Sequence, residues 1–375
     1  MHINVPEKKQ QRFLVASLIS KDSSVDEAFF DIKETRDLID TYGGTVVDYA
    51  IQRREVHARG SYLGRGKVEE ITQSIKENDI DVVILNGIVK PGQIFEVKTD
   101  LSVENPNIIV WDRVDLILQI FSKHASTTEA KLQIELAAMR HMGPRIYDMG
   151  YVLSRQGGTV GTRGIGETNT ELMKRHWRDQ IKKTQDKINK LESEKKFQLE
   201  RRQRNGAVNI SIIGYTNAGK SSLFNLLTNK NRLVEDALFA TLDSNIGKMY
   251  LPDAKMEVLL SDTIGFIKDL PPSLIDAFQS TLLESVYSDF LIHVIDASDP
   301  QIDVKIEAVT RVLEELKIVN KYQIYVFNKS DMLTPEEKLE LQERFADKDP
   351  LFISVKNKVG IEEISKRLSF SLQQK

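Results

Sequence analysis

The chain has 375 residues, 41% of them hydrophobic and 29% charged, and a formal net charge of −3. This length predicts two or three domains, and the composition excludes a disordered chain. The absence of cysteine excludes disulfides and thiolate metal sites and is compatible with a reducing compartment. The first ten residues lack the apolar core of a signal peptide, and charges interrupt the most apolar stretch, residues 108–121. We therefore expect a cytoplasmic protein without a transmembrane segment.

Residues 1–124 alternate between strand-like and helix-like segments. An amphipathic helix is predicted over residues 25–42, and it ends at the pair Gly43-Gly44. The β-branched, apolar runs that predict strands are residues 13–19, 45–49, 81–85 and 107–111. This alternation predicts a small N-terminal α/β domain with a mainly parallel sheet.

Strand signals are absent from residues 125–205, which we interpret as an antiparallel helical hairpin. Two capping boxes, Ser126-x-x-Glu129 and Thr168-x-x-Glu171, predict the helix starts. The first helix either ends near Gly143-Pro144 or continues, kinked, to about Tyr151, and the second runs over residues 169–204. The second helix carries an apolar seam that is too short for a dimeric coiled coil: Trp177, Ile181, Thr184, Ile188 and Leu191.

The hairpin tip is predicted to be the loop of residues 154–166, which holds five glycines and two arginines. One interpretation is a flexible connector. Helical hairpins turn in only a few residues, however, so a longer basic tip favours a function. Residues 174–204 add twelve Lys/Arg against five Asp/Glu. A solvated helix surface explains that charge equally well by itself, but beside a basic tip it favours binding to RNA phosphates.

Residues 206–375 return to alternating strands and helices. Strands are predicted at residues 209–213, 255–261, 290–295, 323–327 and 351–354. The pattern predicts a doubly wound α/β fold with a parallel central sheet.

A phosphate-binding P-loop opens this third domain. The run from Gly214 to Ser221 fits G-x-x-x-x-G-K-[ST] and lies between an apolar strand and an amphipathic helix. Lys220 is expected to place its ammonium between the β- and γ-phosphates as a catalytic group, and Ser221 to offer a hydroxyl to Mg²⁺. The residues predicted to bind the nucleotide here are Gly214, Tyr215, Thr216, Asn217, Ala218, Gly219, Lys220, Ser221 and Ser222.

Two further motifs complete the predicted phosphate and Mg²⁺ site. Asp262 and Gly265 form D-x-x-G at the end of a predicted strand, so Asp262 would contact Mg²⁺ through water and the Gly265 amide would reach the γ-phosphate. Thr241 lies between the P-loop and D-x-x-G, and we expect its hydroxyl to reach Mg²⁺ only in the triphosphate state. Thr228 is the competing threonine, but it belongs to the helix pattern. The predicted metal set is therefore Ser221, Thr241 and Asp262.

The sequence Asn328-Lys329-Ser330-Asp331 predicts guanine as the base. A carboxylate at Asp331 can accept from guanine N1–H and N2–H₂, which adenine does not offer in that geometry. Asn328 would tie loops together, and the stem of Lys329 would pack on the base. After the last predicted strand, Ser354-Val355-Lys356 would supply a backbone donor to guanine O6. GTP and GDP are thus the expected substrate and product.

In motif order and spacing, residues 206–375 resemble the TRAFAC-class P-loop GTPases. Ras-like members place Gln directly after D-x-x-G to orient the attacking water. This chain has Phe266 there, which cannot polarise water. We therefore expect slow intrinsic hydrolysis unless another group or a partner aligns the water.

Nearly the whole chain resembles the HflX family of ribosome-associated GTPases. The resemblance rests on residues 62–67, residues 112–121, and above all Gly157 through Glu171, and Phe266 also matches the family pattern. It implies binding to the large ribosomal subunit and rRNA through the hairpin and tip loop, ribosome-stimulated hydrolysis, and help in splitting or rescuing stalled ribosomes under stress. Many bacterial members continue into a further C-terminal domain, whose contacts we expect to be absent here. We expect a monomer.

Other interpretations stay open at this point. Gly64-Arg65-Gly66-Lys67 could bind phosphate and make the N-terminal region an ATP site, but it is shorter than a P-loop, so a loop entering a helix is favoured. The whole chain could instead be a nucleotide-gated RNA-binding or ribosome-assembly factor whose hydrolysis only times release. It could also be a nucleotide switch for a protein partner unrelated to RNA.

Overall fold

A computed structural model of the chain describes residues 10–21, 25–54, 62–156, 163–230, 238–239, 245–268, 274 and 279–374. The chain divides into two compact units, residues 1–123 with 134–185 and residues 124–133 with 186–375. The limits of the three predicted domains stay a prediction. Among the described residues, none of the helices combines the length and apolar character needed to cross a membrane.

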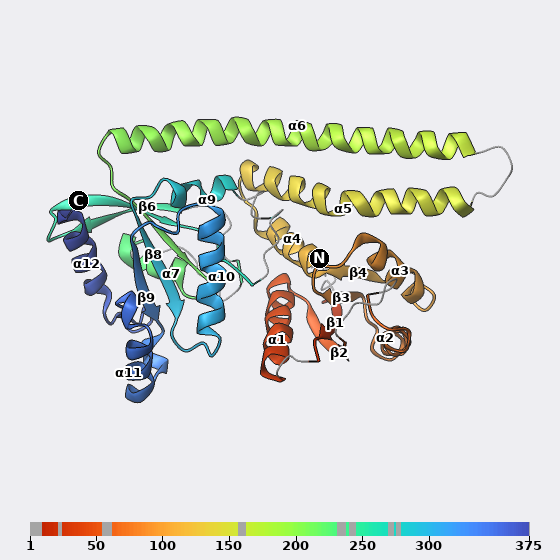
Figure 1. The fold of residues 1–375 in the computed structure, drawn as a ribbon, viewed down its shortest axis with the longest axis horizontal. Helices are drawn as coiled ribbons and strands as arrows, with labels where there is room; N and C mark the ends of the chain where they lie inside the picture. Colours follow the sequence, from red (N-terminus) through yellow and green to blue (C-terminus); the bar gives the residue numbers. More distant parts are fainter. Residues whose placement is uncertain are drawn as a thin grey trace, which may run out of the picture. The chain divides into compact units, whose positions relative to one another are not determined.

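The first unit contains a four-stranded, fully parallel sheet in the order β2-β1-β3-β4, as the alternating pattern predicted (Figure 1). Its strands are β1 (Arg12–Ile19), β2 (Thr45–Arg53), β3 (Val82–Asn86) and β4 (Ile109–Asp112). The helices between and after them are α1 (Val25–Tyr42), α2 (Arg65–Asn78), α3 (Pro91–Leu101) and α4 (Arg113–His124). The buried faces of α2 and α3 share one core with inward residues of β1, β3 and β4, while α1 contacts β1 and β2.

Two long helices, α5 (Thr128–Gln156) and α6 (Arg163–Arg204), form the predicted hairpin. Figure 1 shows them running side by side. The indole Nε1 of Trp177 donates to the carbonyl of Met139 at 3.0 Å, and Arg140 donates to Gln185 at 2.7 Å. Gly143 leaves room for this packing, because a Cβ on it would lie 2.6 Å from the Trp177 indole nitrogen. Trp177 is therefore a seam residue.

The structure corrects the predicted hairpin ends. Helix α5 continues to Gln156, and α6 begins at Arg163, so most of the predicted loop 154–166 is helical and residues 157–162 lie outside the described part. The predicted start at Thr168 is wrong because that residue lies inside α6. The glycines there cost about 1 kcal/mol each in a helix, which continued backbone hydrogen bonding offsets. At the start of α5, the hydroxyl of Thr127, one residue after the predicted Ser126, accepts the Ala130 amide at 3.2 Å.

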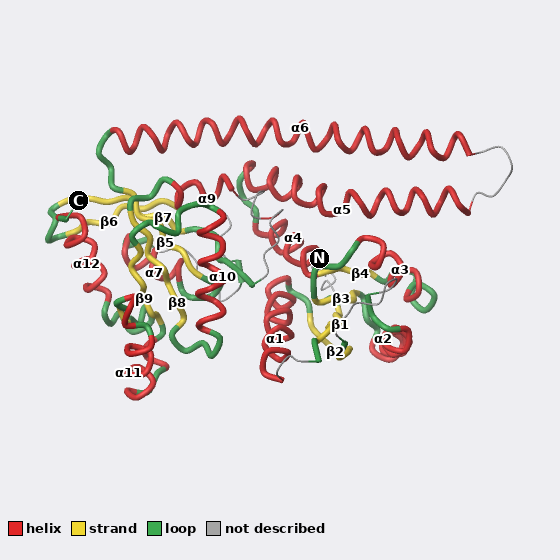
Figure 2. Tube along the Cα trace, viewed as in Figure 1, coloured by secondary structure: helices red, strands yellow, loops and turns green. Residues whose placement is uncertain are grey.

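The second unit contains a six-stranded sheet in the order β10-β9-β8-β5-β7-β6. Its strands are β5 (Asn209–Gly214), β6 (Asn245–Leu251), β7 (Met256–Asp262), β8 (Phe290–Asp296), β9 (Gln323–Asn328) and β10 (Leu351–Phe352). The described helices are α7 (Lys220–Thr228), α9 (Gln279–Val286), α10 (Ile302–Glu315), η1 (Ser330–Met332), α11 (Pro335–Arg344), η2 (Ala346–Lys348) and α12 (Ile361–Gln373). Five strands are parallel, as predicted, and Figure 2 shows helices flanking them.

Strand β6 was not among the predicted strands. It pairs antiparallel with β7 at the edge of the sheet. Its residues alternate in burial: Gly247, Met249 and Leu251 are buried, whereas Lys248 and Tyr250 are exposed. That alternation is the usual signature of a half-buried strand and was present in the sequence.

Each face of this sheet has its own core. The larger core joins α7 and α12, through Phe224 and Leu368 among others, to β5, β7 and β8. The smaller core joins α10, through Ile302 and Ile306, to Phe327 of β9. Because both faces are covered, the loops at the carboxyl ends of the parallel strands are where this sheet can bind a ligand.

Candidate nucleotide-binding site

The P-loop turns sharply between β5 and α7. Gly214 has φ +146° and Gly219 has φ +93°, a region that favours glycine. Gly219 also has a neighbour that excludes a side chain, since a Cβ there would lie 2.3 Å from the Asn328 carboxamide nitrogen. Asn217 is exposed at φ +59°, and Ala218 is buried. The turn thus brings backbone into a site where phosphates can approach closely.

Lys220, the first residue of α7, is buried within this turn. Its Nζ donates to the Tyr215 carbonyl at 2.6 Å. Burial lowers the pKa of Lys220 to about 8, and the nearby Asp262 carboxylate partly opposes that shift. The ammonium is therefore desolvated and held against the backbone of the loop. Ser221 and Ser222 follow it on α7, both half-buried.

We expect nucleotide affinity to fall as the pH rises above about 8. Lys220 is charged below its pKa of about 8 and neutral above it, whereas phosphate binding requires the charged form. The Kd for GDP should therefore be about tenfold higher at pH 9 than at pH 7, measured by calorimetry. The Lys220→Arg variant is the control. Its side chain stays charged over this pH range, so any pH dependence that it shows comes from deprotonation of guanine. An equal pH dependence in that variant would contradict the role of Lys220.

Asp262 and Gly265 lie against the P-loop. Strand β7 pairs with β5 so that Asp262 is opposite Ile212, and Asp262 is 1% exposed. A Cβ on Gly265 would lie 3.0 Å from the Nζ of Lys220. Lys220 of the P-loop is thus brought together with Asp262 and Gly265 of the separate D-x-x-G motif. Thr241 lies outside the described residues.

The donor set fits the chemistry of the predicted Mg²⁺ ion. Ser221 and Asp262 offer hydroxyl and carboxylate oxygens, the ligand type that Mg²⁺ prefers. Nearby, the hydroxyl of Thr216 is buried without a hydrogen-bond partner among the described residues. Such an orphaned hydroxyl, close to Lys220 and Gly265, suits a phosphate oxygen.

The motifs predicted to bind guanine also meet at one place. The Asn328 carboxamide donates to the Ala218 carbonyl at 2.9 Å and accepts the Val355 amide at 3.1 Å. It therefore links the P-loop to the loop after β10. The Ser354 hydroxyl donates to Asp331 at 2.5 Å, and this bond is the main cause of the lowered pKa of Asp331. Asp331 and Lys356 are both exposed, and the Lys356 charge adds to the lowering of the Asp331 pKa.

Two groups of this site were not predicted from the sequence. Asp296, at the end of β8, pairs with Lys329, their Oδ2 and Nζ being 2.7 Å apart. This pair orients the lysine stem that was predicted to pack on the base. An acid at the end of a parallel strand was the available signal. The second group is the Tyr215 phenol, whose hydroxyl accepts the Lys268 amide at 2.6 Å.

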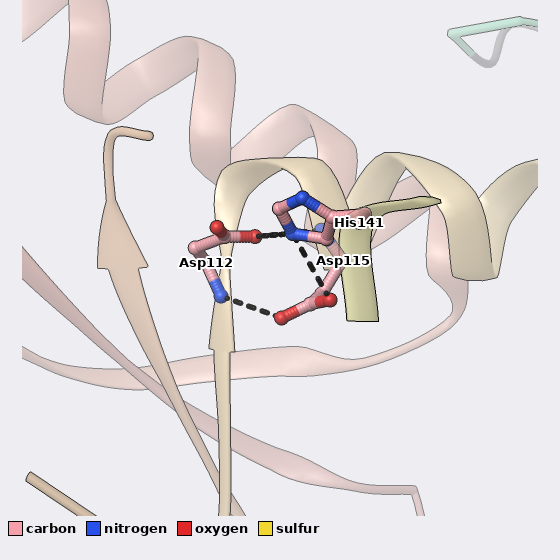
Figure 3. Close-up of side chains that lie close together, drawn as sticks. All are labelled: Asp112, Asp115 and His141. Atoms are coloured by element: carbon pink, nitrogen blue, oxygen red, sulfur yellow. Dashed lines mark hydrogen bonds and ion pairs between the residues drawn. The ribbon is translucent and has the colours of Figure 1, made fainter. Parts of the chain in front are cut away.

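Asp112, Asp115 and His141 form a separate cluster in the first unit (Figure 3). The Asp115 carboxylate accepts the Asp112 amide at 3.1 Å, and the reverse bond measures 2.8 Å. His141 Nε2 lies 3.0 Å from Asp112 Oδ1 and 3.4 Å from Asp115 Oδ1. The two carboxylates cap the start of α4, and the histidine joins that cap to α5. The D-x-x-D spacing could have indicated the cap, but not its histidine partner.

The short run Gly64-Arg65-Gly66-Lys67 enters a helix, as favoured above. Helix α2 begins at Arg65, the Gly64 amide donates to the Gln52 side chain at 2.8 Å, and Lys67 pairs with Glu70 at 2.5 Å. The lysine thus forms an i,i+3 ion pair along its own helix.

Three family profiles match successive parts of the chain. They are described as "GTP-binding GTPase N-terminal" at residues 30–122, "GTP-binding GTPase Middle Region" at residues 124–202 and "50S ribosome-binding GTPase" at residues 209–329. Among solved structures, "crystal structure of SsGBP and GDP complex" is similar with a TM-score of 0.54 and 24% identity, and covers 97% of this chain and 99% of that one. This likeness supports the fold.

Curated relatives named GTPase HflX align over nearly the whole chain. The relative from Caldanaerobacter subterraneus subsp. tengcongensis is 39% identical over 95% of this chain and 79% of its own length. The relatives from Chlamydia pneumoniae and Escherichia coli K12 are 36% and 33% identical over 99% and 96% of this chain, and over 79% and 82% of their own lengths. With GTPase profiles and relatives of this similarity, the chain belongs to the HflX family of GTPases and is a GTP-hydrolysing enzyme.

Proposed function

We propose that this GTPase binds the large ribosomal subunit and its rRNA through the helical hairpin and tip loop. It acts in the cytoplasm as a monomer, subunit contact accelerates hydrolysis, and the GTP-bound form helps split or rescue stalled ribosomes. The observation that carries the proposal is the exposed basic surface along α6: Arg175, Arg178, Lys182, Lys183, Lys187 and Lys190. The profile described as "50S ribosome-binding GTPase" supports the same partner.

Charge of this kind suits an RNA backbone. Cations repeated along a helix can neutralise several phosphates at once, and the released counterions make binding strongly dependent on salt. Such contacts position a protein without reading base sequence. The hairpin would therefore recognise the shape and charge of rRNA.

The base of α6 contacts the GTPase fold at a helix that follows D-x-x-G. Arg202 Nη1 lies 3.5 Å from Glu284 Oε1 on α9, and Gln203 Nε2 donates to the Tyr287 carbonyl at 2.9 Å. Burial raises the pKa of Glu284, and Arg202 opposes the shift. This contact supports coupling between RNA bound to the hairpin and the hydrolytic site.

In hydrolysis, residues of this chain would hold the phosphates in place and neutralise their negative charge. Lys220 would neutralise charge on the β- and γ-phosphates, the Gly265 amide would hold the γ-phosphate, and Asp331 would select guanine. Mg²⁺, held by Ser221, Thr241 and Asp262, would supply further charge neutralisation. Buried Phe266 offers no polar group to the attacking water, which supports a slow intrinsic rate.

The test is GTP turnover with and without purified large ribosomal subunits. We expect at least tenfold stimulation of wild-type turnover, and its loss when residues 157–166 are deleted or when Arg175, Arg178 and Lys182 are changed to Gln. A control with three other exposed lysines changed to Gln, Lys76, Lys98 and Lys248, should retain stimulation. Equal losses in both triple variants would contradict binding through the hairpin.

The alternative is a nucleotide-gated RNA-binding or assembly factor whose hydrolysis times release. The basic surface of α6 and the apolar side chain of Phe266 favour this alternative. Preferential binding to immature subunits, without splitting of whole ribosomes in a sedimentation assay, would support this alternative. Splitting that requires GTP would support the rescue function.

A further inference from the structure

Tyr215 uses its side chain in a way that phosphate binding does not require. A P-loop contacts phosphates through its backbone, yet this tyrosine is 5% exposed and directs its ring into the protein. Its phenol oxygen accepts the backbone amide of Lys268 at 2.6 Å. Lys268 lies three residues after Gly265, on the chain segment that leaves the D-x-x-G motif.

The backbone of the same two segments is also joined. Tyr215 and Phe266 form a parallel bridge. Within it, the Thr216 amide donates to the Phe266 carbonyl at 2.8 Å, and the Phe266 amide donates to the Gly214 carbonyl at 3.1 Å. The segment from Gly265 to Lys268 is therefore held at two places, by backbone bonds at Phe266 and by the Tyr215 phenol at Lys268.

A cation fixes the tyrosine ring itself. The ammonium of Lys305 on α10 lies 4.8 Å from the ring centroid and forms an ion pair with Asp299. An ammonium over an aromatic face is attractive, and more so when partly buried. The ring consequently has a defined position, and its hydroxyl presents a fixed acceptor to the loop.

We propose that Tyr215 is a positioning residue for GTP hydrolysis, whose hydroxyl holds the loop after D-x-x-G so that Gly265 stays against Lys220 and Thr216. A Cβ on Gly265 would lie 2.8 Å from Thr216 Cγ2, so small displacements change this contact. The hydroxyl acts on the loop, and the P-loop backbone that binds the α- and β-phosphates does not depend on it. Loss of the hydroxyl therefore slows the chemical step and leaves GDP binding unchanged. The inference rests on GTP hydrolysis alone and does not involve the ribosome.

The test is the Tyr215→Phe variant, which removes one oxygen and keeps the ring over Lys305. Single-turnover GTP hydrolysis without ribosomes should slow about tenfold, the effect of losing one hydrogen bond that is needed in the transition state. The Kd for GDP should stay within twofold of wild type, and the thermal unfolding midpoint should fall by no more than about 4 °C, the scale expected for one lost hydrogen bond. Tyr250→Phe, which removes an exposed hydroxyl from β6, is the matched control and should hydrolyse at the wild-type rate.

A rate within twofold of wild type would overturn the proposal. So would parallel losses of hydrolysis rate and GDP affinity, because they would assign the hydroxyl to P-loop folding. The Lys305→Met variant gives an independent measurement in case Tyr215→Phe does not fold. This substitution removes the ammonium from the face of the Tyr215 ring. It should slow hydrolysis about threefold while GDP affinity is retained. An unchanged rate would again overturn the proposal.

Discussion

The Asp331→Asn variant should bind GDP about 100- to 1,000-fold more weakly than the wild type. Two hydrogen bonds from guanine to a carboxylate contribute about 3–4 kcal/mol together, and Asn offers only one acceptor while its NH₂ opposes the guanine N2–H₂ group. The Ser354 hydroxyl keeps the pKa of Asp331 low, so the carboxylate is ionised throughout the neutral range. Calorimetric titration with GDP measures the loss.

The same variant should gain affinity for xanthosine diphosphate, whose C2 carbonyl accepts from the new carboxamide. Asp347→Asn is the matched control, because Asp347 is another exposed aspartate of this unit with a lowered pKa, in its case through Lys348. It should leave both affinities unchanged. A Kd for GDP within threefold of wild type in Asp331→Asn would remove Asp331 from base recognition.

The Gly214→Ala variant should lose about 3 kcal/mol in the free energy of unfolding of the GTPase unit. Gly214 has φ +146°, and a Cβ there would lie 2.2 Å from the Val294 carbonyl oxygen. That oxygen belongs to the backbone of β8, which pairs with β5 at this position. The clash can be relieved only by separating the two central strands. Urea unfolding followed by circular dichroism measures the change.

Gly66→Ala is the matched control for this substitution. Gly66 lies inside α2, and no atom lies within 4 Å of a Cβ built on it. Alanine should stabilise that helix by about 0.5–1 kcal/mol. If Gly214→Ala unfolds at the same urea concentration as the wild type, then the close approach of β5 and β8 does not require glycine at position 214.

Local patterns predicted most of the elements. Helix α1 was predicted with the observed bounds because its amphipathic repeat is followed by a Gly-Gly stop. Strand β6 was missed although the alternation of its buried and exposed residues was visible in the sequence. The start of α6 was predicted six residues late because Gly164 and Gly166 oppose helix only weakly compared with the bonds that a continuing helix makes.

The chemical class of the site follows from local residue patterns alone. Gly214 to Ser221 and Asn328 to Asp331 are contiguous runs whose chemistry follows from residue type and spacing, so phosphate and guanine binding could be predicted without a fold. The charge of α6 could likewise be counted directly. Each of these features depends on neighbours within one segment of chain.

The contacts between groups that are distant in the sequence could be known only from the folded chain. Asn328 lies 110 residues from Ala218, and Tyr215 lies 53 residues from Lys268, yet both pairs are hydrogen-bonded. These contacts depend on the strand order, which places β5 between β7 and β8 and brings their carboxyl ends to one edge. No local pattern encodes that order, because it is set by the burial of two apolar faces of the whole sheet.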